Sequence, residues 1–445
     1  MPSVFPFRAV QYQRGTGDVT PFVAPPYDVL DEKAKSALLN RDSRNVVAID
    51  LPHTPAKQLG PPQAYDRAAS TLRAWHSDGT LSRRSIPALF AYRQTFDFAG
   101  KRYQRCGMAC TVEAVPFGPR RGGGVLPHEE TFSGPKEDRF ALMKATRAQL
   151  SPIFGLHADE RGRATSLIHD VMKSRDHDLH ATTEGGVLHE VWTIDDPQTI
   201  RVYSQALEGE DIFIADGHHR YTTGLNYISH LESLGPVGPD HPSRRCMMVL
   251  VGMSDPGLAI GPTHRVLGGM RSYSIDAFLA AAKGILSIIR EVESDLMRIE
   301  HAMAAAQGEN VLGLHDFTTG RCFIATPTDP DPLASRFSSK PRAWRTLDVA
   351  LVQYVLVESI CQPKLNDGEG VKWAFPHSLS EVRDIGQGTE TGSGGGKGFA
   401  QLAVIVRPTP LQAVKDISRA NELMPQKSTF FYPKLATGLF INPLD

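Results

Sequence analysis

The chain has 445 residues, of which 41% are hydrophobic and 22% are charged, a composition typical of a globular protein long enough to bury a core. Its 48 lysines and arginines against 49 aspartates and glutamates leave a formal charge of -1, which argues against binding nucleic acid through a basic surface. The longest strongly apolar stretch, 247–253, is too short to span a bilayer, and the first eight residues are not a secretory signal. We therefore expect a cytoplasmic protein with no membrane partner.

The predicted elements alternate between helices and strands along the chain. Periodicity and caps predict helices from Asp31 and over 64–76, 136–150, 221–234 and most of 275–305. Apolar and β-branched runs predict strands over 45–51, 88–96, 107–113, 190–194, 212–215, 246–251 and 399–406, with a hairpin turn at 98–101. The strand 246–251 does not alternate, so we expect it to be buried on both faces. The mixture predicts an α/β protein with mixed sheets and peripheral helices.

Length and motif positions suggest three regions: an N-terminal α/β region over 1–125, a phosphate-binding core over 126–268, and a C-terminal α/β region over 269–445. The last region carries a flexible Gly-rich insertion at 386–398. This insertion does not match a phosphate loop, because Gly398 follows Lys397 where a Ser or Thr is needed, and Thr391 stands where the first glycine is needed.

The five cysteines form no Cys-x-x-Cys pair, and their number is odd. This pattern predicts neither a disulfide framework nor a zinc knuckle. Cys106 and Cys110 lie in an expected strand, where buried free thiols are the simpler interpretation.

The segment Asp216-Gly-His-His-Arg220 carries the strongest chemical signal, because it joins a strand to a helix through a tight turn. Gly217 allows close approach of the backbone, and a helix starting near His219 offers unpaired N–H groups to an anion. Arg220 adds a forked cation, His218 and His219 can donate or carry protons, and Asp216 could hold a metal or polarise a histidine. The alternative is a strand–helix corner with solvated charges. A paired-histidine metal site is disfavoured, because adjacent helical residues diverge by about 100°.

A second cluster begins with His128-Glu129-Glu130. Carboxylates beside a histidine suit a general base or a metal ligand. Lys136 and Arg139 follow at a helix start, three residues apart on one face, where they could meet a phosphate tail together. A capped, charged helix entry explains the same residues equally well.

Near the C-terminus, Lys427, Ser428, Thr429 and Lys434 supply cations and hydroxyl groups in a loop that Pro433 keeps from being helical. The alternative is a surface strand.

Two shorter signals remain. His264-Arg265 repeats the His-Arg pair after a strand, and a solvated turn explains it equally well. Tyr27 and Asp28 follow two prolines, so they form either a plain turn or a rigid mount that presents an acid to a site.

Taken in order, these motifs resemble one bacterial family that was catalogued as a domain of unknown function. Its members are similar to the free serine kinases, which are related to the nucleotide-binding fold of ParB and sulfiredoxin. The resemblance runs from Pro6 to Gly438, and Gly217-His-His-Arg220 looks like the phosphate-holding turn of that superfamily. The motifs that carry it are 24–29, 128–131, 215–221, 262–265, 424–429 and 431–434.

The resemblance implies a ParB/sulfiredoxin-like nucleotide-binding core and a kinase acting on the hydroxyl of free L-serine or a similar small alcohol. ATP or ADP with Mg²⁺ is the implied donor, and pyrophosphate is a further candidate. Asp216 or Glu129 would hold Mg²⁺ or take the hydroxyl proton, and His218 and Asp28 are further catalytic candidates. The phosphate contacts would come from Gly217, His218, His219, Arg220, Lys136, Arg139, His264, Arg265, Lys427, Ser428, Thr429 and Lys434.

Two other hypotheses stay open. The first is a ParB-like switch that binds a nucleotide without transferring phosphate. The second is a structural protein whose motifs only determine the fold. No nucleic acid partner is expected, and a homodimer is a further expectation.

Overall fold

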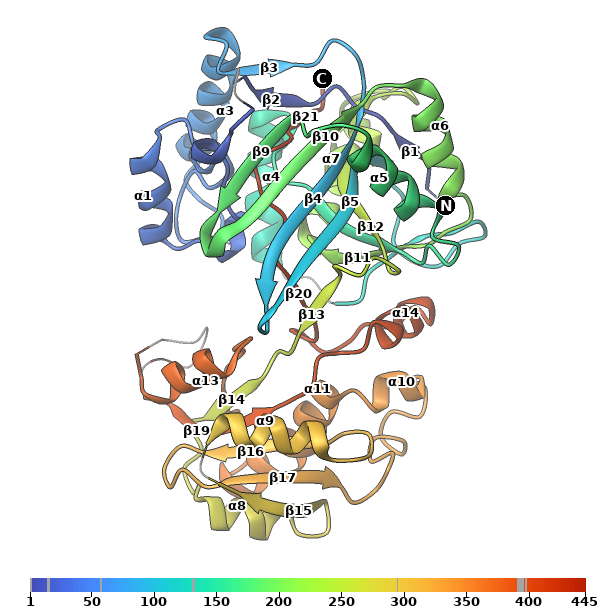
Figure 1. Ribbon diagram of the computed structural model, residues 1–445. Coiled ribbons are helices and arrows are strands. Elements are labelled where there is room, and N and C mark those ends of the chain that lie inside the picture. Colours follow the sequence, from blue (N-terminus) through green and yellow to red (C-terminus); the bar gives the residue numbers. More distant parts are fainter. Residues whose placement is uncertain are drawn as a thin grey trace. The chain divides into compact units, whose positions relative to one another are not determined.

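The computed structural model describes residues 2–13, 17–56, 58–129, 133–293, 295–389, 396 and 398–445. The chain forms two compact units (Figure 1). Unit 1 comprises Met1–Pro127, Thr131–Ala259 and Phe431–Asp445, and unit 2 comprises His128–Glu130 and Ile260–Phe430. The chain therefore passes between the two units around 127–131, at 259–260 and at 430–431. Strands β13 (Ala259–Gly261) and β20 (Phe430–Tyr432) lie at two such crossings.

Within the described residues, unit 1 is built on a nine-stranded mixed sheet with the order β6-β11-β8-β12-β5-β4-β10-β9, and β1 pairs with β5. The β4–β5 hairpin turns between Phe98 and Lys101, as predicted. Strand β12 pairs parallel to β8 and antiparallel to β5 and is buried along nearly its whole length, which confirms that prediction. The strands are β1 (Val4–Phe5), β4 (Leu89–Phe98), β5 (Lys101–Glu113), β6 (Val125–Leu126), β8 (Ile153–His157), β9 (Leu179–Thr183), β10 (Val187–Ile194), β11 (Ile212–Asp216) and β12 (Arg245–Gly252).

Helices and small two-stranded pairings surround this sheet. Side chains from β5, β11 and β12 pack with α5 and α6 into one apolar core. The helices are α1 (Glu32–Arg41), α2 (Val47–Asp50), α3 (Pro62–Ser77), α4 (Ser133–Thr146), α5 (Arg163–Ser174), α6 (Pro197–Ala206) and α7 (His218–Leu234), with short 3-10 turns η1 (Thr20–Phe22), η2 (Tyr27–Val29), η3 (Glu184–Gly186) and η4 (Pro242–Arg244). The small pairings join β2 (Val10–Tyr12) to β3 (Leu81–Arg83) and β7 (Ala148–Gln149) to β21 (Asn442–Pro443).

Unit 2 contains a six-stranded antiparallel sheet with the order β15-β17-β16-β19-β14-β18. Along β19, Leu402 and Val404 enter one apolar core, whereas Ala403 and Ile405 enter another. This alternation places a core on each face of the sheet. The strands are β14 (Arg265–Gly268), β15 (Leu286–Val292), β16 (Leu312–Asp316), β17 (Cys322–Pro327), β18 (Lys372–Ala374) and β19 (Ala400–Ile405).

Helices cover both faces, so unit 2 has three layers. One core takes side chains from α9 (Leu296–Ala305) and α13 (Leu379–Gly386). The other takes side chains from α8 (Ile275–Ala282), α10 (Arg342–Arg345), α11 (Asp348–Leu351), the π-helical η5 (Val352–Cys361), α12 (Gln362–Leu365) and α14 (Leu411–Arg419). The predicted mixed α/β class is confirmed in both units. Most of the predicted insertion 386–398 lies outside the described residues.

The strand predicted over 45–51 is wrong, because this segment contains the helix α2. Asn45 explains the difference. Its side-chain oxygen accepts a hydrogen bond from the N–H of Val47 at 3.0 Å, and its amide donates to the carbonyls of Pro21 and Val23. An asparagine that bonds its own backbone two residues on favours a turn, and this turn leads into α2 against the β preference of the valines.

The helices predicted to start near Asp31 and to cover 64–76 and 221–234 are confirmed by α1, α3 and α7. The helix predicted over 136–150 ends earlier, since β7 follows α4 at Ala148. The region 275–305 contains the edge strand β15 between two helices, which the sequence reading missed. All five cysteines are buried and free, as expected. Among the described residues, no helix has the length and hydropathy needed to cross a bilayer.

Candidate functional site

The turn between β11 and α7 forms as the sequence predicts. Strand β11 is buried up to Ala215, and its pairing with β8 shifts register between Ile214 and Asp216. Such an irregularity re-aims the last side chain of a strand. Gly217 follows with φ +92°, and α7 begins at His218. The first N–H groups of a helix have no partner within the helix, so this end of α7 can receive an anion.

Gly217 has a second reason to be glycine. A Cβ added there would lie 2.9 Å from Nε and 3.0 Å from Cζ of Arg220. The sequence predicts that the missing side chain at Gly217 leaves room for a ligand. In the structure, the guanidinium of Arg220 lies in that space. Gly217 thus permits both the left-handed turn and the position of Arg220.

Asp216 is held by two cations. Its Oδ2 accepts a hydrogen bond from Nη2 of Arg220 at 2.5 Å, and its Oδ1 contacts Nζ of Lys434. Burial alone would raise the pKa of Asp216, but Lys434, Arg220 and His218 outweigh burial and hold that pKa well below its usual range. Asp216 is therefore an ionised anchor for two cations.

The backbone around Lys434 is fixed to the sheet. Arg105 on β5 donates to the carbonyls of Tyr432 and Pro433, and Gln94 on β4 donates to the carbonyl of Lys434 at 3.0 Å. Burial lowers the pKa of Arg105 to about 10. The sequence reading did not assign Arg105 a role. Arg105 directly precedes the apolar part of β5, and the local sequence does not set it apart from the polar residues Arg102 and Gln104 before it.

Asp28 lies on the short helical turn η2 and belongs to the same charge cluster. Burial lowers the pKa of both Arg220 and Lys434, but Asp216 first and Asp28 second raise it above the ordinary value. Oδ1 of Asp28 is buried and has no hydrogen-bond partner among the described residues. The cluster therefore contains two carboxylates and two cations. One of its carboxylate oxygens, Oδ1 of Asp28, makes no hydrogen bond within the described residues that would compete with a ligand.

Arg139 is used inside the fold. Its guanidinium donates to Oδ2 of Asp138 at 2.7 and 2.9 Å and to the carbonyl of Asp50 at 2.6 Å, and it stacks on the ring of Tyr27 at 3.9 Å. These contacts occupy most of its donors. Lys136, three residues earlier on α4, is half-buried. His219, beside His218 on α7, is also half-buried.

A cavity of about 40 Å³ lies behind this cluster in unit 1. One water needs roughly 10–15 Å³ of such space, so the cavity holds a few waters and is too small for a nucleotide. Its polar lining comes from Tyr27, Asp50, Arg139, Gln149, Ser151, Arg220 and Thr223.

Unit 2 brings the other predicted residues together. Oε1 of Glu129 accepts hydrogen bonds from the N–H groups of Ser428 at 3.0 Å and Thr429 at 3.4 Å. Nε2 of His128 shares a hydrogen bond of 2.8 Å with Oγ1 of Thr429. Two successive N–H groups thus grip a carboxylate, which shows that this loop can hold an oxyanion. Lys427, at φ +58°, is exposed beside it.

Arg265 donates a hydrogen bond to the backbone of the same loop. Its Nη2 donates to the carbonyl of Lys427 at 3.0 Å, and its Nη1 donates to the carbonyl of Thr263 at 2.6 Å. Burial lowers the pKa of Arg265 to about 9, although Glu129 raises it. Burial also lowers the pKa of His264 to about 3, so this histidine is neutral near pH 7.

Arg265 also lines a cleft of about 460 Å³ in unit 2. Its size is that of a small-molecule site, and aromatic walls suit a planar ring. The aromatic lining comes from Phe337, Trp344, Tyr354, Trp373 and Phe375.

The predicted residues therefore gather in two clusters, each within one unit. Unit 1 assembles the turn at 216–220 with Asp28 and Lys434. Unit 2 assembles Glu129 and His128 with the loop 427–429 and with Arg265.

A protein-family model described as "Protein of unknown function (DUF1015)" matches residues 4–350. The curated proteins contain no match. Among solved structures, the chain is similar to a free serine kinase in complex with AMP, with 13% identity, a TM-score of 0.31, and coverage of 71% of this chain and 90% of that chain. It is also similar to SbnI with a C-terminal truncation from Staphylococcus aureus, with 9% identity, a TM-score of 0.33, and coverage of 76% and 87%. Likeness at these TM-scores does not bear on function.

Proposed function

The chain belongs to the DUF1015 family, and we propose that it is a small-molecule kinase. In this proposal it transfers a phosphoryl group from a nucleotide to the hydroxyl of free L-serine or a similar small alcohol. The observation that carries the proposal is the charge cluster of unit 1. An available carboxylate oxygen of Asp28 lies in one cluster with Arg220 and Lys434, and Arg220 is in the first turn of α7.

This cluster supplies what phosphoryl transfer demands. The reaction needs little covalent chemistry from a protein, because positioning and charge stabilisation provide most of the catalysis. In the proposal, the N–H groups at the start of α7 receive the donor phosphates. Arg220 and Lys434 neutralise the negative charge that spreads over the transferred group. Asp216 keeps both cations in place through its two oxygens.

Asp28 is the preferred acid for direct chemistry. Both oxygens of Asp216 are engaged by Arg220 and Lys434, whereas Oδ1 of Asp28 has no partner among the described residues. A carboxylate oxygen of this kind can accept a proton from a hydroxyl group beside it. Mg²⁺ bound with the donor phosphates would supply charge neutralisation on their oxygens.

The proposed step balances as follows. The hydroxyl oxygen of the acceptor forms a bond to the terminal phosphorus of the donor. The bond between that phosphorus and its bridging oxygen breaks, and the shortened nucleotide leaves. The hydroxyl proton passes to the carboxylate of Asp28, which acts as general base.

The loop 427–429 is a further proposed anion contact within unit 2. The N–H groups of Ser428 and Thr429 already hold the carboxylate of Glu129, so a phosphate or a substrate carboxylate would meet the same donors. In this proposal Lys427 adds an exposed positive charge to that loop.

A direct assay tests the proposal. The protein is incubated with Mg²⁺, L-serine and either ATP, ADP or pyrophosphate, and phosphoserine is measured by mass spectrometry. We expect phosphoserine with at least one donor and none with Arg220→Ala. The control Arg67→Ala changes an exposed arginine on α3 and should retain full activity. Nucleotide binding without any phosphorylated small alcohol would instead favour the ParB-like switch.

A further inference from the structure

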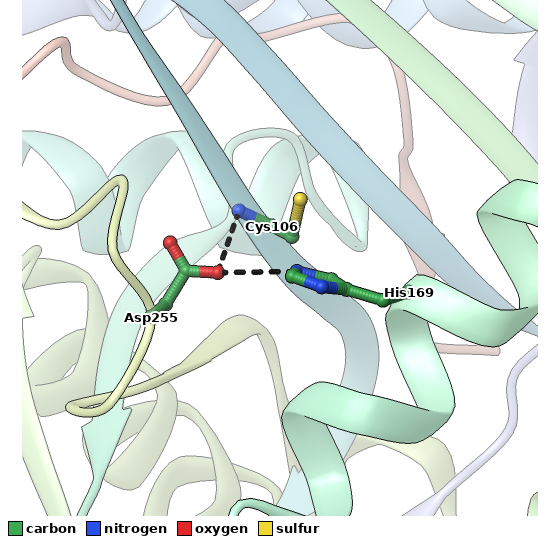
Figure 2. A group of neighbouring side chains, drawn as sticks. All are labelled: Cys106, His169 and Asp255. Carbon is green, nitrogen blue, oxygen red and sulfur yellow. Dashed lines mark hydrogen bonds and ion pairs between the residues drawn. The ribbon is translucent and has the colours of Figure 1, made fainter.

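Three potential metal ligands meet in unit 1 without sharing any residue with the proposed kinase site. They are Cys106 on β5, His169 on α5 and Asp255 in the turn after β12. Figure 2 shows the carboxylate of Asp255 between the backbone N–H of Cys106 and the imidazole of His169. The three ligand atoms lie within 4.8 Å of one another.

The spacing suits one small metal ion. Nε2 of His169 lies 3.6 Å from Oδ2 of Asp255. In a tetrahedral zinc site, bonds of roughly 2.0–2.3 Å place the ligand atoms about 3.3–3.5 Å apart. The nitrogen–oxygen separation is therefore close to that of a loaded site, and small side-chain rotations would bring the sulfur to its place.

The imidazole of His169 gives a second, independent indication. Its Nε2 is buried and has no hydrogen-bond partner among the described residues, although the side chain as a whole is 35% exposed. At 3.6 Å, the nearest carboxylate oxygen is too distant for a good hydrogen bond. A buried ring nitrogen aimed at a carboxylate and a thiol, with no proton partner, is the arrangement of a metal ligand.

Asp255 is already oriented for the same task. Its Oδ1 accepts the N–H of Gly257 at 2.9 Å, which fixes the carboxylate. Its Oδ2 accepts a long hydrogen bond, at 3.4 Å, from the N–H of Cys106 and faces Nε2 of His169. Hydrogen bonds that fix one carboxylate oxygen and leave the other toward the ion are typical outer-shell support for a metal site.

An ion pair between His169 and Asp255 beside an inert thiol is the competing interpretation. It would leave Nε2 of His169 buried without a hydrogen bond, because the nearest carboxylate oxygen is 3.6 Å away. A divalent cation would bind this nitrogen together with the carboxylate and the thiolate.

We propose that Cys106, His169 and Asp255 bind one divalent transition-metal ion of the zinc class. A thiolate, an imidazole and a carboxylate are ligands that Zn²⁺ accepts, and three protein ligands leave a fourth position for water. The partly exposed side of His169 provides the route by which the ion and water enter. The proposal does not depend on kinase activity.

The test measures metal binding directly in the full chain. The protein is stripped with a chelator, titrated with Zn²⁺ and analysed for bound metal, and Co²⁺ replaces Zn²⁺ to reveal sulfur ligation by its thiolate charge-transfer band. We expect one equivalent of metal and a cobalt–thiolate band. Absence of stoichiometric, chelator-reversible Zn²⁺ binding in the folded wild type would overturn the proposal.

Variants assign the ligands. Cys106→Ser should remove the cobalt–thiolate band, and His169→Gln should weaken Zn²⁺ binding by more than about 100-fold. The matched control is Cys110→Ser, four residues along the same buried strand, which should bind metal as the wild type does. His169 is partly exposed, so its variant should fold even if Cys106→Ser does not. Wild-type affinity in folded His169→Gln would sink the assignment.

Discussion

Lys434 contacts Oδ1 of Asp216 although 218 residues separate the two in the sequence. Asp216 comes from the end of β11, whereas Lys434 arrives with the C-terminal segment that Arg105 and Gln94 hold against the sheet. The side chains remain 16% and 24% exposed, so this ion pair lies in a partly desolvated place that ligands can reach. Asp216 contacts both Lys434 and Arg220 and so holds these two cations of the proposed kinase site in place.

Lys434→Met should destabilise unit 1 by about 2 kcal/mol, because it leaves the buried charge of Asp216 with only one cationic partner. Urea unfolding at pH 7 measures this loss. Asp216→Asn and Lys434→Met should each lower the free energy of unfolding. Because the pair is coupled, the double variant should lose about 1–2 kcal/mol less of this free energy than the two single losses added together. Additive losses would show that the contact contributes nothing to stability.

Gly217→Ala should be more costly than an equivalent change elsewhere in the same unit. Gly209 offers a matched control, because its φ is +82° and no atom lies within 4 Å of the Cβ it would gain. Gly209→Ala should cost about 1 kcal/mol from backbone strain alone. Gly217→Ala should cost about 1 kcal/mol more, since it must push the guanidinium of Arg220 away from Asp216. Equal losses in thermal unfolding would contradict this role of Arg220.

The local part of the site could be predicted from the sequence, because a strand, a glycine and a helix start are adjacent in the chain. Arg220 is four residues from Asp216, but its second partner could not be derived in the same way, since Lys434 belongs to a distant segment. Family resemblance named Lys434 as a phosphate contact, but its contact with Asp216 requires the sheet that brings β11 and the C-terminal segment together. The proposed metal site has no sequence signature, because Cys106, His169 and Asp255 come from a strand, a helix and a turn with no fixed spacing.

The errors in the fold prediction have a common physical cause. A run of β-branched residues predicts a strand, but the side chain of Asn45 bonds the N–H of Val47 in a turn and donates to the carbonyl of Pro21. The edge strand β15 was taken for a helix because its exposed residues lack alternation, and only its pairing with β17 defines it. In both segments, contacts formed after folding outweigh the local preference.

His157→Leu should reduce the sensitivity of the protein to acid. Neither ring nitrogen of His157 has a hydrogen-bond partner among the described residues, and burial lowers the pKa of His157 to about 4. Below about pH 6.5 the unfolded chain takes up a proton that the folded chain refuses, so acid favours unfolding. At pH 5 this penalty is about 2 kcal/mol. The variant should therefore gain stability relative to the wild type as pH falls from 7 to 5.

Urea unfolding at the two pH values measures that gain. The control His301→Leu changes an exposed histidine on α9 and should follow the wild type at both. The same pH dependence in His157→Leu and the wild type would show that His157 is protonated, or has a hydrogen-bond partner, in the folded protein.

Asp28→Asn gives the sharpest test of the proposed base. The amide keeps the size of the carboxylate but cannot accept the hydroxyl proton, so kcat for phosphoserine formation should fall by about 10²–10⁴. KM for the nucleotide should change by less than about threefold, because Arg220, Lys434 and the start of α7 still bind the phosphates. Asp28→Glu should restore part of the activity, since it returns a carboxylate at a slightly different place.

The matched control for that test is Asp66→Asn, which removes an exposed carboxylate from α3 and should leave kcat unchanged. A loss of nucleotide binding in Asp28→Asn without a separate effect on kcat would mean that Asp28 only holds Arg220 and Lys434 in position. Full activity in the variant would assign the base elsewhere, and Glu129 would then be the next residue to change. The split between kcat and KM thus separates a carboxylate that takes the proton from one that only balances charge.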